Sequence, residues 1–240
     1  MVLTINNGVL YRTRNFVPDY RYTLNFVDGW SIDEVILLDI SSSSKRNRGA
    51  FVEVVKQFTH NCFVPLTLGG GVLNLEDFSE YFSIGADKVA VNSLLFNSPS
   101  IIHDAVRKFG TQSIVASIDA VKLPNGEYAI RKPCGGYQDD LSPKKMAQLA
   151  QDIGVGEVLI QSVERDGTLE GYDLDLARSV NDAINIPMLL CSGAGRWEHL
   201  ADGLKTGAAC VCTTNIFHFT EKSIASAKAY LKNKDFPVRL

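Results

Sequence analysis

The sequence predicts a single α/β domain over residues 1–240, a (β/α)8 TIM barrel built from two half-barrel repeats. Short apolar segments recur along the whole chain, amphipathic segments of helical length alternate with them, and the alternations fill 240 residues without a linker. Eight near-equal strand–helix units in about 250 residues are typical of this barrel. An open, doubly wound sheet is the alternative fold, and the even spacing of the units favours the barrel.

Eight apolar segments are the expected strands. They are continuously apolar rather than alternating, which is typical of strands buried on both faces of a sheet. After the fifth segment, Pro124-Asn125-Gly126 predicts a β-hairpin at the C-terminal side of that strand. The expected strands are 2–5 (VLTI), 35–39 (VILLD), 63–68 (FVPLTL), 88–92 (KVAVN), 114–119 (IVASID), 157–161 (EVLIQ), 187–191 (PMLLC) and 209–213 (ACVCT).

Helices are expected between the strands. Ser98-Pro99 and Ser142-Pro143 each combine a capping residue with a proline at the first helical position, so we expect them to begin helices. Asn74 precedes a further helix with acidic residues in its first turn. The expected helices are 20–31, 49–59, 75–84, 98–109, 142–154, 173–184, 197–206 and 221–232.

The composition is that of an ordinary globular protein. Apolar residues make up 45% of the chain, charged residues 21%, and the formal net charge is −3. These values exclude a disordered chain and give no support for a nucleic-acid partner. No apolar run is long enough to cross a membrane and the first residues lack the apolar core of a signal peptide, so we expect a cytoplasmic protein.

Cysteine and histidine show no metal-ligand spacing. The five cysteines form no CxxC pair, and their odd number argues against a disulfide framework. We interpret them as small buried apolar residues. The four histidines are scattered, so no metal and no cofactor are expected.

Two halves of the chain repeat each other at an offset of 122 residues. Pro65 and Pro187 each open an apolar strand, and Gly85 and Gly207 each follow the next helix. Asn92-Ser93 and Thr214-Asn215 match at the same offset. One offset kept through a helix and two loops indicates two half-barrels of about 120 residues each.

Glycine-rich loops follow the third and seventh strands, as Gly69-Gly70-Gly71 and Ser192-Gly193-Ala194-Gly195. Glycine allows backbone N–H groups to approach an anion closely, and barrels often bind phosphate after strands seven and eight. Together with Asn92-Ser93 and Thr214-Asn215, the loops predict two phosphate sites and a substrate with a phosphate at each end. Tight turns without a ligand are the alternative.

Carboxylates end two of the expected strands, Asp39 the second and Asp119 the fifth. A buried carboxylate is costly without a partner or a role, so each is a candidate for proton transfer or for binding substrate hydroxyls. Asp39 could instead hold loops together. After the sixth strand, Ser162, Asp166 and Gly167 lie where a barrel carries functional loops.

These residues together resemble the cyclase (HisF-type) subunit of imidazole glycerol phosphate synthase. The matching stretches run from about residue 33 to the C-terminus: DEVILLDIS, PLTLGGG, LEDF, GADKVAVNS, IVASIDA, GEVLIQSVERDGT, EGYDLDL, SGAG, IFHF and FPVRL. The resemblance implies a lyase of histidine biosynthesis in a heterodimer with a glutaminase (HisH-type) subunit. In that family, ammonia passes through the barrel and attacks a bis-phosphorylated ribulosyl aminoimidazole carboxamide nucleotide. Imidazole glycerol phosphate and aminoimidazole carboxamide ribotide are the products.

The resemblance also assigns roles to residues. Asp119 matches a catalytic carboxylate. Glu34, Lys88 and Glu157 match charged residues that gate the ammonia path, and Asp87 matches a residue that faces the glutaminase; a stabilising ring of ion pairs is the alternative for the gate. The remaining matches are with the phosphate sites: Gly70, Gly71, Asn92 and Ser93 in the first half, and Gly167, Gly193, Thr214 and Asn215 with the adjacent Asp166 in the second.

Several positions depart from the family pattern. Thr4 stands where the family has a second catalytic aspartate, and threonine is no general acid near neutral pH. Ser192 replaces a glycine, Arg12 replaces a lysine, and the arginine of the gate has no counterpart. Two alternatives therefore stay open: a paralogue that channels ammonia to amination or amidination of a sugar for bacterial surface glycans, and a non-catalytic activator of the glutaminase. The isomerase sister of the family is less well supported, because it also needs the missing carboxylate.

Overall fold

The computed structural model describes residues 1–21, 32–60, 63–132, 136–138, 141–213 and 223–239. Eight parallel strands form the barrel, and the backbone N–H of Val2 donates to the carbonyl oxygen of Thr213 at 3.2 Å, which joins the first strand to the end of the last. This closure confirms the barrel and excludes the open sheet. The strands, in spatial order, are β1 (Val2–Asn6), β4 (Val35–Asp39), β5 (Leu66–Gly69), β6 (Lys88–Val91), β7 (Ile114–Lys122), β10 (Glu157–Ser162), β11 (Met188–Cys191) and β12 (Cys210–Val211).

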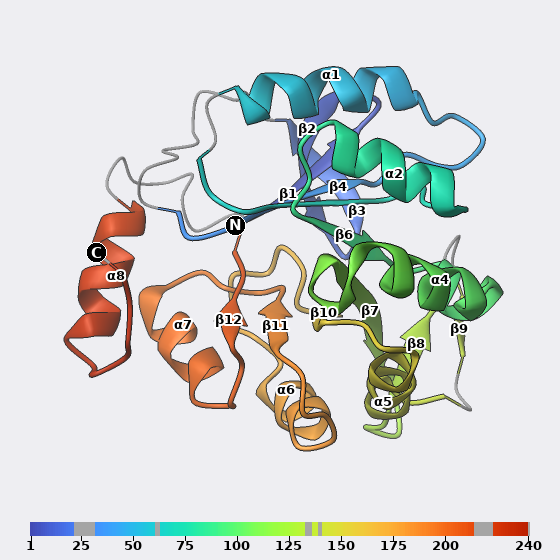
Figure 1. The fold of residues 1–240 in the computed structure, drawn as a ribbon. Helices are drawn as coiled ribbons and strands as arrows, with labels where there is room; N and C mark the ends of the chain where they lie inside the picture. The colour runs from blue at the N-terminus through green and yellow to red at the C-terminus, as the bar shows by residue number, and fades with distance from the viewer. Residues whose placement is uncertain (22–31, 61–62, 133–135, 139–140, 214–222, 240) are drawn as a thin grey trace.

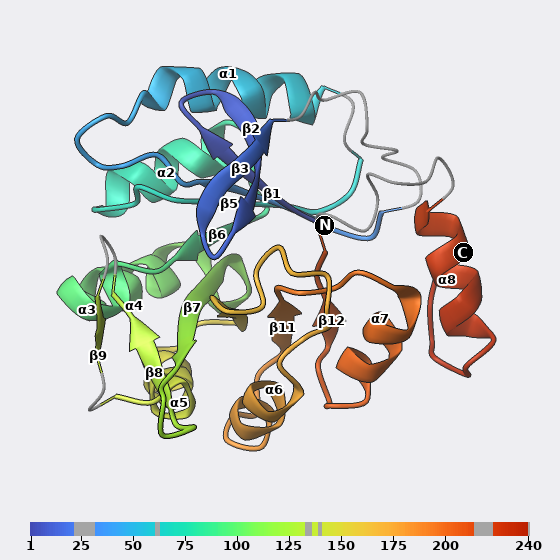
Figure 2. The ribbon, with the colours of Figure 1, turned by 180° about the vertical axis from the view of Figure 1, so that it is seen from behind.

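Helices surround the strands in both views of the molecule (Figures 1 and 2). Asn74 and Asp77 form a capping box at α2, and Ser142 accepts a hydrogen bond from the backbone of Lys145 at α5. Ser98 occupies the N-cap position of α4 with proline in the first turn, which confirms the predicted start, but its side chain makes no capping hydrogen bond. The helices are α1 (Arg48–Thr59), α2 (Leu75–Ser83), α3 (Leu94–Asn97), α4 (Pro99–Phe109), α5 (Pro143–Ile153), α6 (Leu174–Asn181), α7 (Trp197–Leu204) and α8 (Ser223–Lys232).

Two β-hairpins extend the first strand of each half-barrel. The hairpin predicted at 124–126 is confirmed, because β8 (Tyr128–Arg131) pairs antiparallel with β7, and β9 (Tyr137–Gln138) follows. The other hairpin, β2 (Val9–Arg14) and β3 (Val17–Arg21), was not predicted, although Asn7-Gly8 is a strong hairpin signal. Residues 20 and 21 lie in β3, so the helix expected over 20–31 does not begin at residue 20. Residues 22–31 lie outside the described part of the chain.

Alternation along the strands separates two apolar layers. One layer packs between the strands and the surrounding helices. A second, smaller layer fills the barrel interior with Val2, Ile36, Ala90, Val115, Leu159, Leu189, Cys191 and Cys212. Because successive side chains of a strand point to opposite faces, residues two apart from this inner set also face the axis. Lys88 and Glu157 therefore face it at one end, and Asp119 and Gln161 at the other.

The cysteines in the described residues are free thiols. Cys191 and Cys212 are buried in the inner layer and Cys210 packs beside them, as expected for small apolar residues. Cys62 and Cys134 lie outside the described residues. Within the described chain, no helix has the length and apolar character needed to cross a membrane.

Candidate functional site

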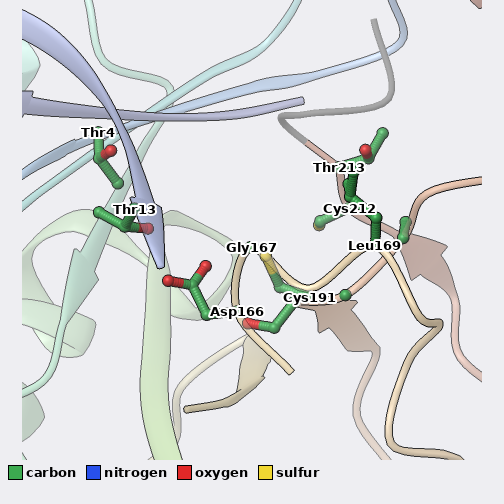
Figure 3. Close-up of a pocket in the computed structure, with 11 residues that line it drawn as sticks. Thr4, Thr13, Asp166, Gly167, Leu169, Cys191, Cys212 and Thr213 are labelled. Atoms are coloured by element: carbon green, nitrogen blue, oxygen red, sulfur yellow. The ribbon is translucent and has the colours of Figure 1, made fainter. Parts of the chain in front are cut away.

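A pocket opens at the carboxyl ends of the barrel strands (Figure 3). It holds about 390 Å³ of empty space, counting solvent at its mouth, and lies between β1, β2 and the loops after β10, β11 and β12. Four of the predicted site residues, Thr4, Asp166, Gly167 and Gly193, line it. The full lining is Thr4, Thr13, Asp166, Gly167, Leu169, Cys191, Ser192, Gly193, Ala194, Cys212 and Thr213.

Two hydroxyl groups on this lining are buried without a partner. Ser192 Oγ and Thr213 Oγ1 have no hydrogen-bond partner among the described residues. A buried, unpaired hydroxyl costs free energy, so its presence at a pocket indicates a group that a ligand satisfies. Ser192 is not glycine although its φ is +79°, and this strained position brings a hydroxyl to the loop. Thr213 ends the eighth expected strand, but the predicted binding residues there were Thr214 and Asn215, which both lie outside the described residues.

We expect Thr213→Val to stabilise the free protein and to weaken phosphate binding. Valine has the same shape and removes the unpaired oxygen, so the free energy of unfolding should rise by about 1–2 kcal/mol. Urea denaturation measures the first effect, and calorimetric titration with inorganic phosphate the second.

Thr206→Val is the matched control for this prediction. Thr206 is equally buried, but its hydroxyl donates to the Gly203 carbonyl at 2.6 Å. The control should lose about 1 kcal/mol of stability and keep phosphate binding. If the two variants change the free energy of unfolding and phosphate binding alike, the Thr213 hydroxyl does not bind a ligand.

Asp119 lies near the carboxyl end of β7, on the face that points to the barrel axis. Its carboxylate accepts one hydrogen bond from Asn92 Nδ2 and one from Gln161 Nε2, both at 3.1 Å. Burial raises the pKa of Asp119 to about 6, although the charge of Arg131 and both hydrogen bonds lower it. A carboxyl group whose pKa is near neutrality suits proton transfer. Gln161 was missed: its counterpart at the 122-residue offset is Asp39, whose side chain lies on the other face of its strand, so the repeat does not indicate it.

Thr4 faces the same pocket, but its hydroxyl proton is already in use. Thr4 Oγ1 donates to the carbonyl oxygen of Tyr11 across the β1–β2 pair. The hydroxyl can therefore accept a further hydrogen bond, whereas it cannot also donate one to a ligand. Thr4 therefore supplies no proton to a ligand at this position.

Asp166 holds the β2–β3 hairpin over the pocket. Its Oδ2 accepts from the backbone N–H of Phe16 at 2.9 Å, and the Thr13 side chain also hydrogen-bonds to it. In Figure 3 the Asp166 carboxylate points toward Thr13. Burial raises the pKa of Asp166, and these hydrogen bonds oppose that effect. The hairpin, absent from the sequence prediction, thus forms one wall of the site.

The glycine loop of the first half is packed on an ion pair. Asp39 Oδ2 lies 3.1 Å from Arg46 Nε, and its other oxygen accepts from the backbone of Ser41 at 2.9 Å. A Cβ atom at Gly71 would come within 2.5 Å of the Arg46 guanidinium, and one at Gly70 within 2.1 Å of the Asp39 carbonyl oxygen. Arg46 thus brings a positive charge to the predicted phosphate loop, and Asp39 holds it there.

Three other predicted residues take the following places. Asn92 uses its side-chain amide on Asp119, so it links the first phosphate loop to the catalytic candidate. Ser93 follows it at the start of the short helix α3 and makes no side-chain capping bond. Ser162 is buried, and the alternation of β10 points it away from the axis.

The charged residues at the opposite end of the barrel meet as predicted. Lys88 Nζ lies 3.1 Å from Glu34 Oε2 and 2.6 Å from Glu157 Oε1. Burial lowers the pKa of Lys88, but hydrogen bonds and charge from Glu157 and Glu34 outweigh it and raise the pKa overall. Asp87 is exposed beside them, with one carboxylate oxygen accepting from the Leu66 backbone at 2.8 Å.

The fold and the site define a class: a closed (β/α)8 barrel of two half-barrels, with a carboxyl group of raised pKa and a polar pocket at the carboxyl ends of its strands. Residues 5–223 match the family described as "Histidine biosynthesis protein", and the chain belongs to this family. It is 39% identical over 216 residues to the imidazole glycerol phosphate synthase subunit HisF of Chlorobium limicola, covering 90% of this chain and 85% of that relative. Identity to the HisF subunit of a Hydrogenobaculum species is 37% over 209 residues, covering 87% and 82%. The resemblance read from the sequence is therefore confirmed.

Proposed function

We propose that this protein is the cyclase-type synthase subunit of a glutamine amidotransferase in histidine biosynthesis. It uses ammonia to convert the bis-phosphorylated ribulosyl nucleotide to imidazole glycerol phosphate and aminoimidazole carboxamide ribotide. One observation carries the proposal: Asp119, with its raised pKa, lies at the same end of the barrel as the two glycine loops, and Ser192 and Thr213 of the second half have unpaired hydroxyls there. The family membership and the HisF relatives support it.

The residues divide the work as follows. The loop with Gly167, Ser192 and Gly193, with Thr213, binds one phosphate, and the loop at Gly71 with Arg46 binds the other. The substrate then spans the mouth and passes Asp119 between the two loops. Asp119 transfers protons there, because its pKa near 6 lets it take and release a proton near neutral pH.

Ammonia enters from the other end of the barrel under this proposal. A glutaminase subunit docks at the face that carries Asp87 and the Lys88–Glu34–Glu157 ion pairs, and forms a heterodimer with this chain. The barrel interior between the two ends is lined by apolar side chains and thiols. A neutral ammonia molecule crosses such a lining at far lower cost than an ammonium ion.

Lys88→Met is expected to uncouple the two activities. Without the ammonium group, Glu34 and Glu157 face each other unpaired, which should lower the free energy of unfolding by about 1–3 kcal/mol. Glutamine-dependent turnover with the glutaminase should fall, while turnover with added ammonium salt persists, because the pocket is unchanged. The ratio of the two rates is the measurement.

Lys228→Met is the control for the loss of a half-buried ion pair. Lys228 of α8 pairs with Asp33 at 2.8 Å and is buried to a similar degree. This variant should lose stability and keep the ratio of the two rates. If both variants change the ratio alike, Lys88 has only a structural role.

The direct test of the proposed function is ammonia-dependent turnover. The purified chain is given the ribulosyl bis-phosphate nucleotide and ammonium salt at alkaline pH, and loss of substrate absorbance is followed. Turnover that Asp119→Asn abolishes supports the cyclase. Binding without turnover rejects the histidine-pathway reaction, and absence of binding means that the phosphate loops serve another ligand.

One observation favours a second candidate, the ammonia-channelling paralogue that serves sugar amination or amidination. Three charged residues of the gate, Lys88, Glu34 and Glu157, pair at the barrel bottom, whereas Thr4 supplies no acid at the top. For this candidate we expect stimulation of the glutaminase and release of ammonia without turnover of the nucleotide. Stimulation without passage of ammonia would instead indicate a non-catalytic activator.

A further inference from the structure

Arg131 is placed opposite Asp119 by the pairing of β7 and β8. Ala120 pairs with Ile130 in this antiparallel ladder, so the next position of the register brings Arg131 across from Asp119. Cross-strand neighbours project from the same face of a sheet. The guanidinium therefore lies on the side of the hairpin that faces the barrel mouth, where Asp119 also accepts from Asn92 and Gln161.

Phe16 supports the guanidinium from the other hairpin. The Arg131 Cζ atom lies 5.4 Å from the centroid of the Phe16 ring. Asn15 and Phe16 both have positive φ, +51° and +64°, which is strained for a bulky side chain. Asp166 holds this strained turn through the backbone N–H groups of Asn15 and Phe16. Strain maintained by two hydrogen bonds at a site indicates a functional arrangement.

The guanidinium keeps its donors available. The Arg131 guanidinium forms no salt bridge or hydrogen bond with any residue that the structure describes, and the residue is partly exposed. Its charge acts on both Asp119 and Asp166 from a distance. Stacking on an aromatic ring fixes the plane of a guanidinium and leaves its N–H groups at the edge, directed at a ligand.

We propose that Arg131 binds a substrate oxygen midway between the two phosphate ends and stabilises the negative charge that develops there. The proposal rests on the proposed function. When ammonia adds to the ribulosyl carbonyl carbon, the C–N bond forms and the π electrons of the C=O bond move to oxygen. One proton of the new ammonium group passes to the Asp119 carboxylate. Arg131 donates hydrogen bonds to this oxygen. Its positive charge stabilises the negative charge there, in a site where Thr4 cannot donate a proton.

Arg131→Met tests the proposal by two readouts. We expect calorimetric binding of the ribulosyl nucleotide to weaken by about 10- to 100-fold, the effect of one charge-assisted hydrogen bond. Ammonia-dependent kcat should fall further, by about 10²–10³, because the interaction strengthens as charge develops on the oxygen. Arg131→Lys keeps the charge but loses the planar guanidinium. Its kcat and its affinity for the nucleotide should lie between those of Arg131→Met and the wild type.

A pH profile separates this role from a structural one. Arg131 lowers the pKa of Asp119 while Asp166 raises it, so removal of the guanidinium should move the acidic limb of kcat/KM to higher pH. Lys122→Met is the matched control, because Lys122 stacks on Tyr128 at 5.4 Å in the same hairpin. The control should leave binding, kcat and the limb unchanged. Thermal melts verify that each variant is folded. If Arg131→Met is unfolded, the same measurements compare Arg131→Lys with the wild type.

The outcomes are distinguishable. The wild type could bind and turn over the nucleotide while Arg131→Met keeps an affinity and a kcat within threefold of the wild-type values. In that case the Arg131 proposal fails and the proposed function stands. If the wild type binds without turnover, the reaction is wrong, and weaker binding by Arg131→Met still supports the contact. If the wild type does not bind the nucleotide, both proposals are rejected.

Discussion

Replacing Asp119 with asparagine is expected to lower ammonia-dependent turnover by about 10²–10⁴, the usual contribution of one acid/base group. Asparagine keeps the size of the side chain but neither takes nor releases a proton near neutral pH. Substrate binding should change little, because the phosphate loops carry it. Steady-state kinetics with ammonium salt measure kcat and KM separately, and a loss confined to kcat is the expected result.

The same substitution should change how stability depends on pH. Burial raises the pKa of Asp119 from 3.8 to about 6 in the folded protein, so between these values the folded chain holds a proton that the unfolded chain has lost. The free energy of unfolding should therefore fall as the pH rises from about 4 to 6, by at most about 3 kcal/mol from this group. Asp119→Asn should lack this dependence. Urea denaturation of the wild type and of Asp119→Asn at pH 4.5 and pH 8 compares their free energies of unfolding.

Asp173→Asn is the control for a buried carboxylate outside the pocket. Asp173 accepts from the Tyr128 hydroxyl at 2.7 Å and from the Leu176 backbone at 3.1 Å, at the start of α6. The control should lose some stability and retain turnover. Full activity in Asp119→Asn would refute the catalytic role, and equal loss in both variants would assign the effect to folding.

Gly193→Ala is expected to cause the largest loss of stability. Gly193 has φ +99°, and an added Cβ would lie 2.3 Å from the carbonyl oxygen of Gly171. The loop cannot easily shift away, because the Gly171 N–H donates to the Gly193 carbonyl at 2.7 Å. Backbone strain and the steric clash together should cost about 3 kcal/mol or more. Calorimetric titration should also show that phosphate binding is lost.

Gly126→Ala separates the two costs. Gly126 at the tip of the β7–β8 hairpin has φ +87°, but no atom lies within 4 Å of an added Cβ. Only the conformational cost remains there, about 1 kcal/mol. Urea denaturation of both variants measures the difference, and similar losses would show that the loop around Gly193 relaxes and that the close contact with Gly171 is unimportant.

The sequence by itself determined the elements and their repetition. Continuous apolar runs gave strands near their observed positions, and proline and asparagine near helix starts placed α2, α4 and α5 within two residues. These signals are local, since periodicity and capping depend on residues within one or two turns of each other. The 122-residue offset extended them to the half-barrel symmetry and to the paired glycine loops, and Asp119 was found as a carboxylate that ends an apolar strand.

Only the tertiary structure decided which side chains are free to act. Thr4 donates to Tyr11, Asp39 holds Arg46, and Asp166 holds a hairpin that the sequence did not predict. Thr213 retains an unused hydroxyl at the pocket, and the Arg131 guanidinium, stacked on Phe16, retains unused donors among the described residues. The physical reason is that a polar group's partner is set by strand register and by loops more than 100 residues apart, as between Phe16 and Asp166. Local sequence determines where a strand lies, and the closed barrel determines which of its hydrogen-bonding groups remain for a ligand.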